Sequence, residues 1–174
     1  MSACNHPSSL SALACAIAIA ALPRIAGAEY ELSSYTDPPG GAEIARGDYA
    51  AAITAASRRV RWPGVETALV AATNLCVAHT VRREFEAATA PCNEAVALAR
   101  RSEPTRGVHA RTNTALARAL SNRGVLRALA GDPEGAARDF RAALRRTRSW
   151  DGPERNIAQL ERASAQRVAA AAEE

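Results

Sequence analysis

Cysteine and histidine are the residues of this 174-residue chain best suited to metal binding or redox chemistry. Cys76, His79 and Cys92 form one group of such residues, and His79 lies about one helical turn after Cys76. A tetrahedral zinc site needs about four such ligands, so this group is incomplete. A redox-active pair is typically spaced Cys-x-x-Cys, which the chain lacks. The sequence therefore predicts no metal site and no other cofactor.

Motifs for nucleophilic or nucleotide-dependent catalysis are also missing from the sequence. It contains no Gly-x-Ser-x-Gly, no phosphate-binding loop and no dinucleotide fingerprint. Acidic residues such as Glu84, Glu86, Asp132 and Glu134 stand where helices are expected to begin, and the helix dipole explains that placement. We therefore predict a non-enzymatic protein, with a small enzyme of unrecognised type as the alternative.

The charge pattern indicates an ordinary solvated surface. The net charge is +4, and every basic residue other than histidine is arginine. Clusters such as Arg82-Arg83 and Arg145-Arg146 could contact phosphates. Aromatic residues make up only 4% of the chain, however, too few for the stacking on bases that single-stranded nucleic acid requires. We therefore predict no nucleic-acid partner.

The N-terminus has the features of an export signal. Residues 9–22 form an apolar run, and Ala26-Gly27-Ala28 gives a small-x-small cleavage pattern before Glu29. The run is shorter than the ~20 residues that span a bilayer. We expect residues 1–28 to be removed by cleavage between Ala28 and Glu29, which sends the mature chain to the periplasm. A lipid anchor on Cys15 is the alternative, although the apolar run continues beyond that residue.

The rest of the chain has the composition of a helical protein. Alanine, leucine and arginine are abundant, and these residues favour helix. Residues 29–41 contain two prolines and two glycines, so we expect an irregular lead-in there. Residues 42–152 are predicted to form helices separated by proline and glycine breaks. Residues 153–174 are predicted to form a terminal helix, because Pro153 suits a first helical position.

An internal repeat runs through the helical part. Residues 47–57, 83–96 and 131–144 align without a gap, and each opens with a turn pair. The three pairs are Gly47-Asp48, Arg83-Glu84 and Gly131-Asp132. Upstream, residues 69–81 align with residues 117–129, which matches Asn74 to Asn122 and Cys76 to Gly124.

This pattern resembles the tetratricopeptide repeat (TPR) family, whose repeats of about 34 residues are pairs of antiparallel helices. The copy with Gly131-Asp132, Ala136, Phe140 and Ala143 is the best match. The resemblance covers residues 42–148. It implies an all-α, right-handed α-solenoid of about three TPR-like helical hairpins with a C-terminal capping helix.

In such a hairpin, Cys76 and Cys92 would lie at equal distances from a turn at residue 84. Two inward-pointing side chains at equal height face each other, and disulfides persist in oxidising compartments. We therefore predict a Cys76–Cys92 disulfide. The alternative is a pair of buried free thiols that pack as small apolar groups.

The resemblance also gives Asn74 and Asn122 a possible role. In TPR proteins this asparagine often projects into the concave groove and hydrogen-bonds the backbone of an extended peptide. The same face would carry five further residues: Thr73, Val77, Ser121, Val125 and Arg118. The resemblance thus implies a scaffold that binds a protein or peptide. The alternatives are a structural or regulatory subunit of a cell-envelope complex, docking through its convex face or terminal helix, or asparagines that only satisfy local backbone.

Overall fold

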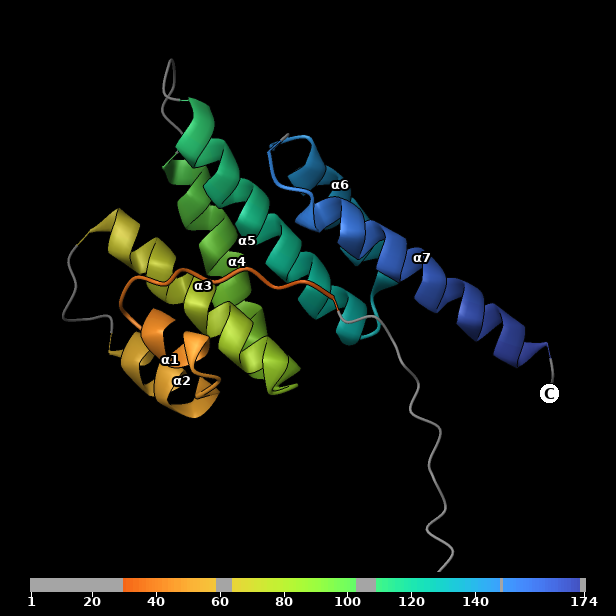
Figure 1. Cartoon of the computed structure of the whole chain (residues 1–174), viewed down its shortest axis with the longest axis horizontal. Helices are drawn as coiled ribbons and strands as arrows, with labels where there is room; N and C mark the ends of the chain where they lie inside the picture. The colour runs from red at the N-terminus through yellow and green to blue at the C-terminus, as the bar shows by residue number, and fades with distance from the viewer. Residues whose placement is uncertain (1–29, 59–63, 103–108, 148, 173–174) are drawn as a thin grey trace, which may run out of the picture.

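The computed structural model describes residues 30–58, 64–102, 109–147 and 149–172, and this part of the chain is helical without strands (Figure 1). The predicted leader, including Cys15 and the cleavage site between Ala28 and Glu29, lies outside the described residues. The helices are α1 (Gly41–Ala45), α2 (Tyr49–Ser57), α3 (Val65–Val81), α4 (Phe85–Arg101), α5 (His109–Leu129), α6 (Pro133–Leu144) and α7 (Gly152–Ala171). The predicted all-α class is confirmed.

Consecutive helices pack on one another. The pairs α3–α4 and α5–α6 have the most extensive contacts, and α4 packs against α5 between them. Helix α7 packs on α5 and α6 and then continues beyond them (Figure 1). The described part of the chain is therefore an all-α fold of a helical-repeat kind.

The turns between paired helices have a shared backbone conformation. Gly47, Arg83 and Gly131 have φ angles of 76°, 60° and 89°, so all three lie in the left-handed region. The next residues in the first and third turns, Asp48 and Asp132, begin α2 and α6. Each aspartate side chain accepts a hydrogen bond from the N–H three residues on, at 3.0 and 2.8 Å. These are the N-caps that the repeated turn pairs predict.

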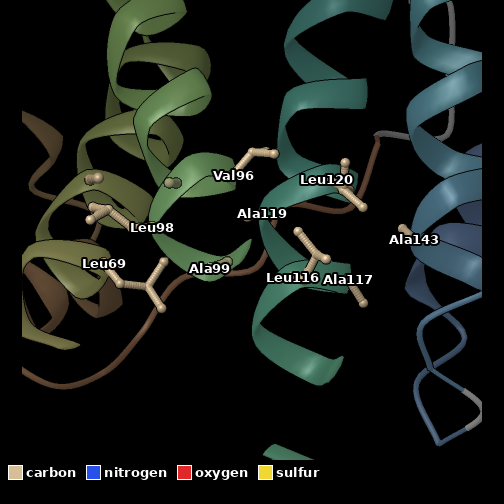
Figure 2. Close-up of a cluster of buried hydrophobic side chains, with 11 residues drawn as sticks. Leu69, Val96, Leu98, Ala99, Leu116, Ala117, Ala119, Leu120 and Ala143 are labelled. Carbon is tan, nitrogen blue, oxygen red and sulfur yellow. The ribbon is translucent and has the colours of Figure 1, made fainter. Parts of the chain in front are cut away.

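Small side chains allow the helices to approach closely. The largest buried apolar cluster joins α3, α4, α5 and α6 through residues such as Leu69, Val96, Leu116 and Ala143 (Figure 2). Alanines supply much of the remaining cluster, and they leave the helix axes close together. This core fixes α3 and α5 relative to each other, and both helices contribute to the site described below.

The two hairpins are closed by different chemistry at equivalent positions. In α3–α4, Cys76 and Cys92 form a disulfide with a Cα–Cα distance of 4.7 Å, which confirms the predicted pairing. In α5–α6, Phe140 is fully buried and its ring lies against the backbone of Gly124. A Cβ at Gly124 would come within 2.5 Å of that ring. The aligned Cys76/Gly124 pair thus marks the same junction in both hairpins.

Candidate functional site

The segment that the sequence marked only as an irregular lead-in lies across three helices. Residues 30–37, here called the docked segment, cross α5 and α3 in an extended path (the orange trace in Figure 1). Their backbone has no regular secondary structure, yet alternate N–H groups along it are paired with side chains. The side chains responsible are three asparagines on three different helices.

We call Asn74, Asn122 and Asn156 the asparagine ladder, because they meet the docked segment at every second residue. The Oδ1 atom of Asn156 accepts from the N–H of Glu31 at 2.7 Å. The Oδ1 atom of Asn122 accepts from the N–H of Ser33 at 2.9 Å. Asn74 completes the series by accepting from the N–H of Tyr35 at 2.9 Å. Alternate backbone N–H groups of an extended chain point the same way, so one ladder can bind all three.

Each amide also donates back to the segment. Asn156 Nδ2 donates to the carbonyl of Glu31 at 2.9 Å, and Asn122 Nδ2 donates to that of Ser33 at 2.8 Å. Asn74 Nδ2 donates to the carbonyl of Asp37 at 3.5 Å and, just beyond the segment, to that of Pro39 at 3.0 Å. Because both ends of each amide bind main-chain atoms, the ladder recognises backbone and leaves the side-chain sequence free.

The ladder asparagines are buried beneath the segment, with exposed fractions of 0–1%. Buried amides without partners cost about 1–3 kcal/mol each, so the ladder requires a backbone to occupy it. Asn74 lies on α3 and Asn122 lies on α5, and the apolar cluster packs these two helices together. The core thus sets the spacing of the ladder.

Side chains of the docked segment make their own contacts at its N-terminal end. Glu31 accepts from Trp150 Nε1 at 3.2 Å and from Arg155 Nε at 2.8 Å. Tyr30 stacks on Phe140 with ring centroids 6.2 Å apart. Leu32 joins Tyr30 in the cluster around that ring. The hydrogen bond to Glu31 raises the pKa of Arg155 above its usual value.

At the other end, the guanidinium of Arg118 lies 4.1 Å from the centre of the Tyr35 ring. This arrangement is a cation–π contact. Burial raises the pKa of Tyr35, and the positive charge of Arg118 opposes that shift. Beside them is a cavity of about 730 Å³, partly lined by Val65, Leu69 and Ala115.

The other predicted site residues are buried, and most do not contact the segment through polar groups. Thr73 and Val77 are 1% and 3% exposed. Ser121 Oγ instead accepts from Asn156 Nδ2 at 3.1 Å, which steadies the ladder. Val125 packs with Phe140 in the cluster that Tyr30 and Leu32 cover. Asn74, Asn122 and Arg118 thus contact the docked segment directly, and Val125 belongs to the cluster that also contains Tyr30 and Leu32.

Asn156 was missed because the repeat was aligned on its turn pairs, and α7 has no turn and second helix after it in the described chain. A signal was present, since Asn156 follows Asn122 by 34 residues, the length of one repeat. On α7, Leu160 is buried, but Val168 is 71% exposed.

The incomplete metal group is not assembled in the structure. Cys76 and Cys92 are joined to each other, and His79 Nδ1 lies 2.7 Å from Glu84 Oε2. This contact and a hydrogen bond from Arg82 lower the pKa of Glu84. Among the described residues, no cluster of three or more candidate metal ligands is found. In that same part of the chain, none of the helices combines the length and hydropathy needed to cross a bilayer.

The fold and the ladder place the chain among all-α proteins built like helical repeats. Comparison with family models, curated proteins and solved structures gives no match to any of them. Its function must therefore be argued from its own geometry.

Proposed function

We propose that this chain is a non-catalytic TPR-like scaffold that binds an extended segment of another protein or peptide. In this proposal the hairpins form a short right-handed α-solenoid capped by α7. A cleaved signal peptide exports the chain to the periplasm. A buried disulfide is compatible with that oxidising compartment.

The asparagine ladder is the observation that carries the proposal. Asn74, Asn122 and Asn156 come from three helices and bind alternate residues of one extended backbone. Amides arranged in this way suit a polypeptide ligand, since main-chain groups are common to every sequence. The flanking contacts of Arg118 and Arg155 would add preference for particular side chains.

The proposal can be tested by capture from the exported fraction of the native host. Every bait is the tagged chain beginning at Glu29 with Glu31→Ala/Tyr35→Ala, which removes the contacts to Arg155 and Arg118 and so weakens the chain's own segment on the ladder. The ladder variant adds Asn74→Ala/Asn122→Ala. Each truncation deletes hydrogen bonds to ligand backbone, so retention of a partner should fall about tenfold per asparagine.

Asn93→Ala is the matched control for this capture. Asn93 is exposed on α4 and contacts Arg123 at 3.1 Å, away from the ladder. The control should retain the partner as well as the bait with the intact ladder does, and thermal unfolding should show that all baits are folded. Equal capture by baits with the intact and the altered ladder would eliminate the ladder as the docking site.

The exposed end of α7 supports a second candidate function, a subunit that docks into an envelope complex through its terminal helix. Residues from Glu161 onward are mostly exposed, and Val168 presents an apolar side chain to solvent. Deletion of residues 165–174 leaves Asn156 and Leu160 in place, whereas a cut at Pro153 would remove both from the core. Loss of the partner after this short deletion, with the ladder intact, would favour docking through α7.

A further inference from the structure

The ladder face is already occupied by the chain itself, and the occupant is a surface segment. Residues 30–35 are only partly buried, and residues 36–38 are exposed. The amides beneath them are fully buried. Removal of the segment would expose the ladder without opening the main cluster of Figure 2, which the segment does not join.

An empty ladder is the least favourable state, because three amides would lose backbone partners that only water could replace. Another extended backbone can offer the same N–H and C=O groups in the same alternation. Exchange of one segment for another therefore leaves the number of main-chain hydrogen bonds unchanged. The side-chain contacts then decide which segment is held.

Those side-chain contacts specify a ligand chemistry. One end of the site offers Trp150 Nε1 and the Arg155 guanidinium to an acidic side chain. The ring of Phe140 stacks on Tyr30, the residue that precedes Glu31. At the far end, Arg118 covers an aromatic ring. These contacts therefore select a segment by its acidic and aromatic side chains as well as by its extended shape.

We infer that residues 30–37 are an intramolecular ligand, and that the scaffold's partner displaces them with an extended segment of the same chemistry. That segment carries an aromatic, an acidic and an aliphatic residue in sequence, followed three residues later by a second aromatic. The docked segment meets this description with Tyr30, Glu31, Leu32 and Tyr35. The inference rests on the proposed function and names the class of partner.

Covalent attachment gives the docked segment an advantage over any free competitor. A short tether typically produces an effective concentration in the millimolar range. A free peptide of identical sequence should therefore displace half of the docked segment only at roughly millimolar concentration. If substitutions weaken binding of the tethered segment by a given factor, the peptide concentration that displaces half of it should fall by the same factor.

The test uses the oxidised, ¹⁵N-labelled chain beginning at Glu29 and an unlabelled peptide of residues 29–39. The readout is hydrogen exchange at the amides of Ser33 and Tyr35, both of which donate to ladder oxygens. In the free protein these amides should exchange slowly. Addition of the peptide should accelerate their exchange progressively, while core amides of α3 and α5 stay protected.

A weakened-segment protein provides the second arm. Glu31→Ala/Tyr35→Ala removes the contacts to Arg155 and Arg118 and keeps all the ladder asparagines. The wild-type peptide should bind this protein about tenfold more tightly than it binds the wild-type protein. A peptide carrying the same two alanines is the matched control, and it should bind the weakened-segment protein at least tenfold more weakly than the wild-type peptide does.

Two outcomes would overturn the inference. If the amides of residues 33 and 35 remain protected in both proteins at several millimolar peptide, the segment is a permanent part of the fold. If light scattering shows a dimer that the peptide dissociates, the ligand is the segment of a second copy. A permanent segment would exclude the ladder as the docking site and leave only other surfaces of the scaffold for a partner. The capture experiment above tests the proposed function separately.

Discussion

The hairpins α3–α4 and α5–α6 hold their two helices together by different contacts at aligned positions. At the same height above the turn, the first joins Cys76 to Cys92, and the second places Phe140 against Gly124. Both solutions let the helices approach closely, but only the second provides a ring for Tyr30 of the docked segment. The disulfide closes its hairpin without any ligand, whereas the aromatic closure is completed by the segment above it.

The turns of the two hairpins differ less. His79 contacts Glu84 across the first turn, and Arg127 lies 3.9 Å from Asp132 across the second, at aligned positions. The second hairpin adds a buried network in which Asp139 accepts from Arg123 and Arg127 at 2.7–2.8 Å. The residue aligned with Asp139 in the first hairpin is Pro91, which cannot form such a network. Ion pairs thus reinforce the hairpin that lacks a covalent bond.

Loss of the aromatic closure should have the largest effect. Phe140→Ala leaves a cavity where a fully buried ring stood, so unfolding free energy should fall by about 4 kcal/mol. Chemical denaturation of the oxidised protein measures this. Phe85→Ala in the first hairpin is the comparison, and it should cost less because Phe85 is only partly buried. Equal losses of unfolding free energy in the two variants would mean that the buried Phe140 contributes no more to its hairpin than the partly buried Phe85 contributes to the first.

Loss of the covalent closure should rank next. Cys76→Ala/Cys92→Ala removes a cross-link between residues 16 apart, which should reduce stability by about 3 kcal/mol. Reduction of the wild-type protein should produce a similar loss in denaturation measurements. The double variant should not respond to the reductant, and a response would show that the effect does not come from this disulfide.

The buried network of the second hairpin should contribute less than either closure. Asp139→Asn leaves Arg123 and Arg127 facing a neutral amide, and both arginines are partly exposed. Solvent therefore screens part of the effect, and we expect a loss of about 2 kcal/mol in unfolding free energy. Added salt should reduce the difference between wild type and variant. A difference that salt does not change would indicate a packing defect.

The smallest effect concerns the turns. Arg83 has the left-handed conformation that Gly131 adopts at the aligned position. Arg83→Gly removes that strain and should stabilise the protein by about 0.5–1 kcal/mol. Gly131→Ala should destabilise by a similar amount, although its Cβ would meet no neighbour within 4 Å. Thermal unfolding of both variants checks the opposite signs, and changes in the same direction would refute the equivalence of the turns.

Much of this architecture could be predicted from local sequence. Turn pairs such as Gly131-Asp132 carry their own conformational preferences, and the spacing of Cys76 and Cys92 about a turn is enough to place them face to face. The docked segment could not be predicted, because an extended chain held by side chains shows no periodicity of its own. Its hydrogen bonds depend on the relative placement of α3, α5 and α7, which only packing determines.

The sequence distances bridged by the ladder affect how the molecule is made. Tyr35 pairs with a residue 39 positions away, Ser33 with one 89 away and Glu31 with one 125 away. The residues of the docked segment leave the ribosome before every helix of the described chain, and Glu31 can pair with Asn156 only after α7 has been made. Its pairing is therefore completed last, since long-range contacts form only once the intervening chain exists. Until then, the N–H of Glu31 lacks the acceptor that Asn156 supplies in the folded protein.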